Sequence, residues 1–305
     1  MQDILERPHY RKLFFLVMAL LLVIILVVRF FVLPAFDDKL AITPSSLTAS
    51  LLDDVFTSIV VTVAIGGFVF WLTPQVMHKS KLESVEPHDI GDLLRSAAND
   101  TSEWWFRGGL GRYTRTTTLR LMDEAARRKN VRLQITIEIL DPDNQELRAS
   151  YATYRQGRNS ALADASPWTE TRVRHELLAT ILRAYKTKAQ ETMLDVKVVL
   201  SQFYSSFRLD VSSQYVVVTK EDKRAPALRC DKGTYFYNAY RDDVMLSASQ
   251  GRHLGSKPAE LDLSHLTPSV ARQLFEHLLI KTDGVSDEGM ASVIVMASDT
   301  KDPYA

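Results

Sequence analysis

The strongest candidate for chemistry in the 305-residue chain is a stretch in which arginines surround glycines. It reads RGGLGR over 107–112, and Arg115 and three threonines at 116–118 follow. Backbone amides of a glycine-rich turn can approach an anion, arginines neutralise it, and a helix start adds partial positive charge. We expect Arg107, Arg112 and Arg115 to bind an anion, a nucleotide or a lipid headgroup. The alternative interpretation is a structural turn with a solvated basic rim.

Other motifs that would indicate an enzyme are missing from the sequence. The arginine–glycine stretch has neither the spacing of a dinucleotide-binding fingerprint nor the Gly-Lys-Ser/Thr of a P-loop. None of the seven histidines belongs to an HExxH pattern, and there is no G-x-S-x-G elbow. The single cysteine, Cys230, excludes an intrachain disulfide and a multi-cysteine zinc site. We therefore predict no catalytic residue, no metal ligand and no cofactor.

Charge and hydropathy divide the chain into two regions. Lysine plus arginine equals aspartate plus glutamate at 37 each, which argues against a general nucleic-acid binder. The long apolar runs lie in the first eighty or so residues, and the remainder has the composition of an ordinary domain with its own core.

Two apolar segments, 13–33 and 55–72, predict a transmembrane hairpin. Basic residues flank both outer ends, so 1–12 and everything after the second span are expected in the cytoplasm of a bacterial inner-membrane protein, with 34–54 as a short external loop. Residues 73–87 are expected to be a linker and 284–305 a tail. Gly66 and Gly67 would let another helix approach closely, which suggests a homo-oligomer formed through these spans.

Between these segments, 88–283 is expected to form an α/β or α+β sandwich, because helical and strand periodicities alternate. Helices are predicted from about 90, from 117 or 118, over 147–157, from Pro167 to about 193, and from Pro268. Strands are predicted around 104–106, 131–139, 194–200, 207–211 and 215–219, with another at 234–237. No strong periodicity follows position 286.

The order of these elements resembles the phospholipase D-like fold. Residues 104–140 resemble its opening βαβ unit, and 194–240 resemble the part that carries the H-x-K-x(4)-D motif. The matching stretches here are FRLD at 207–210, VVVT at 216–219 and KGTYF at 232–236, and no histidine in the chain is followed two positions later by lysine. The resemblance implies a non-catalytic relative that binds rather than cleaves, with Arg208 joining the anion-binding arginines.

The layout as a whole is similar to the two-transmembrane effectors of bacterial antiviral systems, such as those of retrons and cyclic-nucleotide signalling operons. That resemblance implies an effector or toxin that perturbs the lipid bilayer when a regulatory protein or a nucleic-acid-containing complex triggers its cytoplasmic domain. Two other hypotheses are a membrane-tethered phosphodiesterase, in which Arg107, Arg112, Arg115 and Arg208 would hold phosphate, and a non-enzymatic membrane scaffold.

Overall fold

The computed structural model describes residues 44–72, 82–158, 166–222 and 224–304, together with a few positions between 16 and 27. It divides the chain into two compact units, Met1–His78 and Lys79–Ala305. The domain therefore begins before the predicted start at 88, because strand β1 (Glu83–Val85) already belongs to the second unit.

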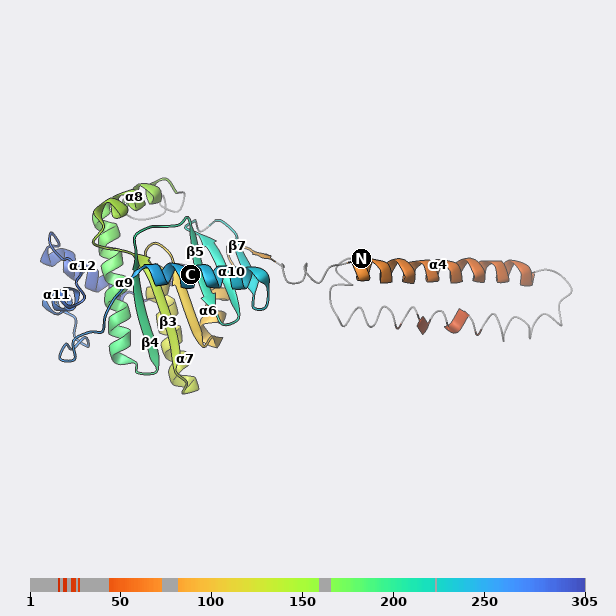
Figure 1. Cartoon of the computed structure of the whole chain (residues 1–305), viewed down its shortest axis with the longest axis horizontal. Helices are drawn as coiled ribbons and strands as arrows, with labels where there is room; N and C mark the ends of the chain where they lie inside the picture. Colours follow the sequence, from red (N-terminus) through yellow and green to blue (C-terminus); the bar gives the residue numbers. More distant parts are fainter. Residues whose placement is uncertain are drawn as a thin grey trace. The chain divides into compact units, whose positions relative to one another are not determined.

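The first unit contains helix α4 (Pro44–Leu72), drawn in orange in Figure 1. This helix begins eleven residues before the predicted second span, so it takes in part of the expected external loop, including the positions of Asp53 and Asp54. Among the residues that the structure describes, no helix has the length and apolar character needed to cross a membrane. The predictions of a transmembrane hairpin and of a multi-pass inner-membrane protein with cytoplasmic termini are corrected accordingly. Most of 13–33 lies outside the described residues.

Gly66 and Gly67 lie within α4. A Cβ atom added at Gly67 would meet no described atom within 4 Å, so the structure shows no helix packed closely against this glycine. Association of two copies through these glycines stays a prediction.

The second unit is an α/β domain built on one eight-stranded mixed sheet with the order β1-β7-β6-β5-β2-β3-β4-β8. Strands β2, β3 and β4 are parallel, and every other neighbouring pair is antiparallel. The strands are β1 (Glu83–Val85), β2 (Glu103–Arg107), β3 (Leu133–Leu140), β4 (Leu194–Ser201), β5 (Phe207–Ser212), β6 (Tyr215–Lys220), β7 (Ala227–Asp231) and β8 (Arg252–His253).

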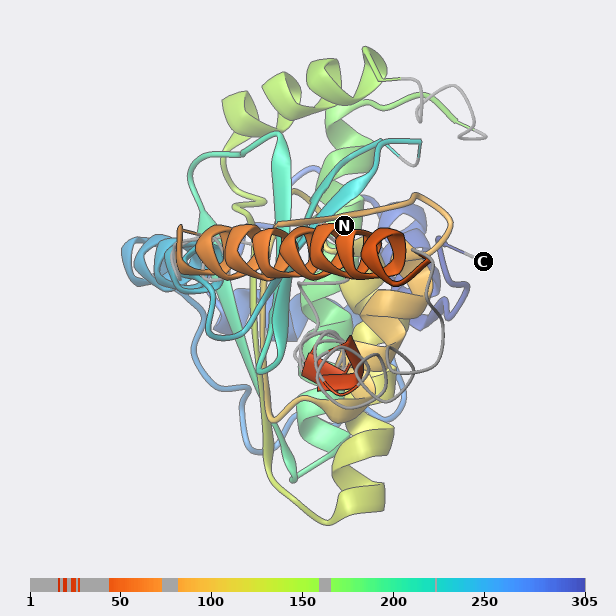
Figure 2. The ribbon, with the colours of Figure 1, turned by 90° about the vertical axis from the view of Figure 1, so that its right-hand side faces the viewer.

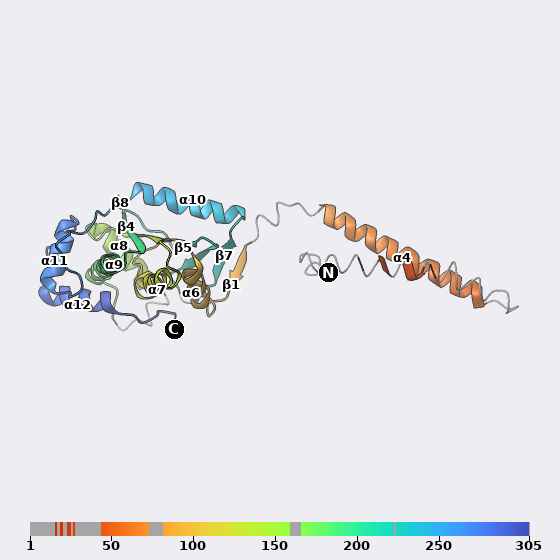
Figure 3. The same ribbon diagram turned by 90° about the horizontal axis from the view of Figure 1, so that it is seen from below.

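Helices cover the two faces of this sheet unequally, as Figure 3 shows. Helices α6 (Ile90–Asp100), α7 (Leu119–Lys129) and α9 (Glu170–Gln190) lie on one face, and α11 (Pro268–His277) and α12 (Asp287–Ser298) extend that layer. Helix α10 (Tyr235–Gln250) crosses the other face. Since successive strand residues point to opposite faces, Ile135, Ile137 and Ile139 enter the larger core while Thr136 and Glu138 point toward α10.

The smaller core lies beneath α10. It contains Leu209, Val211, Val216, Val218, Cys230, Tyr237 and Val244. Cys230 is fully buried, and burial raises the pKa of its thiol to about 11. Cys230 therefore contributes to packing as a small apolar side chain.

Polar side chains define where most helices begin. Asn144 caps α8 (Gln145–Gln156), and Thr169, Thr267 and Ser286 cap α9, α11 and α12 by accepting a backbone N–H three residues on. The same device corrects one prediction: Thr234 caps α10, so the strand expected at 234–237 is the first turn of a helix. Likewise, the expected tail 284–305 includes α12, which packs against α9.

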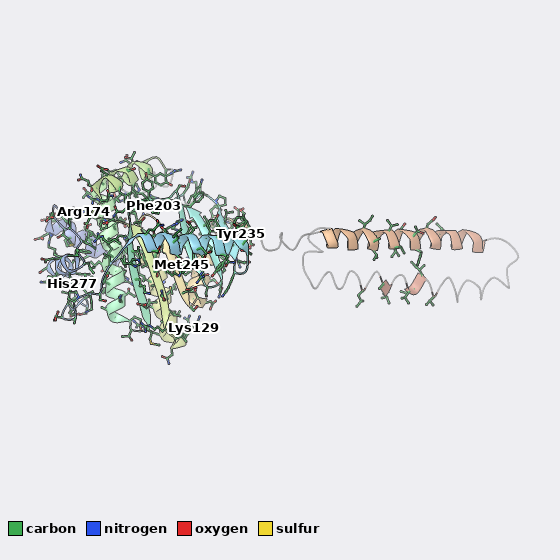
Figure 4. The ribbon with its side chains drawn as sticks, in the orientation of Figure 1. Lys129, Arg174, Phe203, Tyr235, Met245 and His277 are labelled. Carbon is green, nitrogen blue, oxygen red and sulfur yellow. The ribbon has the colours of Figure 1, made fainter. Side chains whose placement is uncertain are left out.

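Helix α8 lies beyond the end of the sheet at which β3 finishes, as Figures 1 and 2 show. Phe203, just after β4, lies toward this carboxyl end, and Lys129, just before β3, lies at the opposite end (Figure 4). The loop after β2 runs toward α8, and Gly109 touches it. A Cβ atom added at Gly109 would lie 2.1 Å from the Tyr151 hydroxyl oxygen.

We expect Gly109→Ala to lower the free energy of unfolding by about 1–3 kcal/mol, because the buried Tyr151 ring must move to admit the methyl group. Gly255→Ala is the matched control, since an added Cβ there meets no described atom within 4 Å, and it should change stability by less than about 0.5 kcal/mol. Urea denaturation measures both. Equal effects of the two substitutions would contradict close packing at Gly109.

Candidate functional site

A cavity of about 100 Å³ opens at the carboxyl ends of β2 and β6. Segments far apart in the sequence form its walls: the loop after β2, helix α8, the start of β5, the end of β6 and the last residues of the chain. Four lining residues are basic and two are acidic. They are Arg112, Arg155, Arg208 and Lys220, and Glu221 and Asp222.

The first wall is the turn that follows β2. Gly111 has a φ of +69°, a left-handed conformation that favours glycine, and it directs the chain into Arg112 and Tyr113. A π-helical turn, η2 (Thr114–Thr118), then joins this turn to α7. Thr117 and Thr118 therefore do not cap α7 as expected; they lie inside a continuous helical segment.

Tyr113 lines the cavity and carries an uncommitted hydroxyl group. Its side chain is 3% exposed, and its hydroxyl has no hydrogen-bond partner within the described residues. Burial, reinforced by the carboxylates of Asp302 and Asp210, raises the pKa of Tyr113 well above its usual range. The hydroxyl therefore stays protonated and can donate to an anion.

The second wall is α8. The Tyr151 hydroxyl donates to the Glu221 carboxylate, and Arg155 Nη1 lies 3.0 Å from Glu221 Oε2. The indole ring of buried Trp168 lies beneath two cavity arginines, with guanidinium carbons 4.5 Å (Arg155) and 5.8 Å (Arg112) from its centroid. Cation–π contact thus orients both guanidinium groups toward the same space.

Arg208 enters from β5. Its Nε lies 3.0 Å from Asp210 Oδ2, and its Nη2 donates to the Tyr304 hydroxyl at 2.8 Å. Asp210 is 1% exposed, and burial raises its pKa although Arg208 opposes the shift. Its second oxygen, Oδ1, has no hydrogen-bond partner within the described residues. The Arg208 guanidinium is therefore fixed at the edge of the cavity by a partly satisfied carboxylate.

Of the four predicted anion-binding arginines, the structure brings Arg112 and Arg208 to this cavity and places the other two elsewhere. Arg115 is a core residue: its guanidinium reaches Glu176 Oε2 at 2.7 Å, the Glu176 carbonyl at 3.0 Å and Thr180 Oγ1 at 3.2 Å. Both side chains are about 95% buried, so this ion pair attaches the π-helical turn to α9.

Arg107 lies on the opposite face of the sheet from Arg208. It ends β2 and pairs with Leu209 in the register, one position away from Arg208, so alternation points the two side chains apart. Its Nη2 contacts Asp243 Oδ2 of α10 at 2.6 Å. Nearby, buried Glu138 accepts a hydrogen bond from Ser247 at 2.6 Å.

Several residues of the cavity were not predicted from the sequence as site residues. They are Tyr113, Tyr151, Arg155 and Tyr304. Tyr151 and Arg155 are four residues apart, which places them on one face of α8, and this spacing was the available signal. Nothing in the sequence connects them to positions 208 or 304. Within the described ranges, no group of three or more histidine, cysteine, aspartate or glutamate side chains could hold a metal ion.

Comparisons with known proteins identify no family. No family model matches the chain, and no curated protein matches it. Among solved structures, it is similar to TrmBL2, an archaeal chromatin protein whose structure shows a novel mode of DNA binding. The match covers 69% of this chain and 71% of that chain, at 8% identity and a TM-score of 0.33. A similarity this low supports no conclusion about function. The resemblances to the phospholipase D-like fold and to antiviral effectors, and the expected regulatory partner, stay predictions.

We expect Arg115→Met to destabilise the domain by about 3–5 kcal/mol, because it leaves Glu176 buried with a poorer partner, Arg112 at 3.4 Å. The double variant Arg115→Met, Glu176→Met removes both charges and should recover a large part of that loss. Urea denaturation of the single and double variants measures the coupling. Additive losses would show that the pair does not act as a unit.

Glu138 gives a pH-dependent prediction. Burial raises its pKa above the ordinary 4.5, although Ser247 and Arg107 oppose the shift. The folded state therefore keeps this proton to higher pH than the unfolded state, and stability falls as pH rises from about 4.5 through the folded pKa. Glu138→Gln lacks this loss, so its stability relative to wild type should be higher at pH 7 than at pH 4. Exposed Glu124→Gln is the control, and equal differences at both pH values for Glu138→Gln would refute the assignment.

Proposed function

We propose that the domain Lys79–Ala305 is a binding module for a small phosphate-bearing molecule, with the anion held in the cavity between Arg112, Arg155 and Arg208. The observation that carries this proposal is the convergence of three guanidinium groups from separate segments with the unpartnered, buried hydroxyl of Tyr113. Planar guanidinium groups bind phosphate oxygens in a bidentate manner, and a protonated phenol adds a further donor.

The place and size of the cavity support a small anion. Ligands of α/β sheets bind beyond the carboxyl ends of parallel strands, and β2 ends at this cavity. Its volume of about 100 Å³ is below the roughly 300–1,000 Å³ of pockets that enclose a drug-sized ligand. The enclosed space therefore suits a phosphate group, with the rest of the ligand outside it.

The nearby carboxylates are expected to lower the affinity of the cavity for an anion. Glu221 already pairs with Arg155, and Asp210 pairs with Arg208, so an incoming anion competes with both. Binding is then favoured by the excess of basic over acidic side chains in the lining and is weakened by salt. We infer that arrival of such an anion is the signal that this domain receives.

Arg112 offers the clearest test, because its side chain is 36% exposed and Arg115 remains with Glu176 when Arg112 is replaced. Calorimetric titration of the full chain with inorganic phosphate and pyrophosphate at low ionic strength should show binding. Arg112→Gln should weaken that binding by about ten- to a hundredfold, since a hydrogen bond to a charged group contributes roughly 1.5–3 kcal/mol.

Arg120→Gln is the matched control, because Arg120 is 41% exposed on α7, pairs with Glu124, and lies outside the cavity lining. It should leave the dissociation constants unchanged, which separates a local contact from a general loss of positive charge. The proposal is wrong if wild-type protein does not bind either anion at millimolar concentration, or if the two variants bind equally well.

A further inference from the structure

Two residues near the C-terminus, Pro303 and Tyr304, line the cavity. The Tyr304 ring meets the Tyr113 ring edge-on, with centroids 5.2 Å apart and planes at 74°. Its hydroxyl accepts a hydrogen bond from Arg208 at 2.8 Å, and the Arg208 guanidinium carbon lies 5.6 Å from the ring centroid. Tyr304 therefore uses a guanidinium group and an aromatic surface that a ligand in the cavity would contact.

This segment is fastened by a small number of polar contacts. Arg95 Nη1 lies 2.5 Å from Asp302 Oδ2, and the Tyr304 backbone N–H donates to Asp302 Oδ1 at 2.7 Å. Gly91 of α6 leaves room for the segment, since a Cβ atom there would lie 2.9 Å from the Tyr304 Cβ. Tyr304 and Asp302 are only partly buried, so the segment packs against the edge of the larger core rather than inside it.

We propose that the ligand of this site is an aromatic phosphate whose ring replaces the Tyr304 ring against Tyr113 and Arg208, and whose binding displaces the segment Asp302–Tyr304. The proposal rests on the function proposed above and adds the chemical class of the ligand. The phosphate occupies the space between the arginines, and the ring occupies the position that the structure already fills with a phenol.

The geometry distinguishes this ligand from a free anion. A flat ring can contact the Tyr113 ring and the Arg208 guanidinium at once, as the Tyr304 ring does, and both contacts are attractions to a π-system. Inorganic phosphate has no ring, so it gains nothing from this subsite and can bind with Tyr304 in place. An aryl phosphate must compete with Tyr304 for the same surface.

The test compares inorganic phosphate with phenyl phosphate by calorimetric titration of the full chain. Tyr304→Ala removes the competing ring, so the preference for phenyl phosphate, expressed as the ratio of the two dissociation constants, should rise roughly tenfold over wild type. Tyr235→Ala is the matched control, because Tyr235 is a 67% exposed tyrosine of α10 and should leave the ratio unchanged.

A second variant and a second readout do not depend on removing the ring. Asp302→Asn weakens the contact with Arg95, and it should raise the same ratio by a smaller factor. Lys301 is already exposed, and displacement should release the attached residues that follow it, so trypsin should cleave after Lys301 faster with phenyl phosphate than with inorganic phosphate at equal occupancy. Mass spectrometry identifies the released fragment.

The outcomes separate the two proposals. If phosphate binds but the ratio is unchanged in Tyr304→Ala and cleavage after Lys301 does not accelerate, the aromatic subsite is wrong and the anion site stands. If neither probe binds wild type or Tyr304→Ala, both proposals fail.

Discussion

The buried ion pair between Arg115 and Glu176 is the constraint on which the cavity depends. It joins the π-helical turn after β2 to the long helix α9, at a point where both side chains are almost fully buried. Because Arg112 and Tyr113 immediately precede that turn, the ion pair fixes the wall that they form. Arg115 was expected to bind a ligand, but its role in the structure is to hold in place Arg112 and Tyr113, which line the cavity.

The sheet imposes the second constraint, since it separates the arginines by face. Arg107 and Arg208 lie at the same end of neighbouring strands, yet alternation sends one toward α10 and the other toward the cavity. On the side toward α10, Arg107 forms an ion pair with Asp243. The other side combines Arg208 with α8 and the C-terminal segment, and there the described residues bring together the basic groups that suit an anion.

Local signals in the sequence predicted much of the domain, but they did not predict features that depend on contacts between distant segments. The alternating residues of β3 and β4 and the helix predicted to begin at Pro268 correspond to observed elements, because each depends on neighbours within a few positions. The first turn of α10 was predicted as a strand, since aromatic residues such as Tyr235 and Tyr237 are common in strands, and the cap at Thr234 was not recognised.

The candidate site was likewise predicted only where local signals in the sequence indicated it. Arg112 was predicted because it follows a glycine-rich stretch, whereas Arg155 and Tyr304 reach the cavity only through the packing of α8 and the path of the chain after α12. The membrane hairpin was inferred from apolar runs alone; α4 takes the second of these runs into a longer helix that also contains part of the polar segment before it.

Because α10 covers Cys230 on one face of the sheet, the reactivity of this cysteine depends on whether the helix stays in place. Cys230, the one thiol of the chain, is sealed between β7 and α10, and the high pKa of its thiol keeps it unreactive while that helix stays in place. Alkylation of Cys230 therefore requires an opening that uncovers the thiol, such as detachment of α10. The rate of labelling would measure how often this face of the domain opens, without any introduced probe.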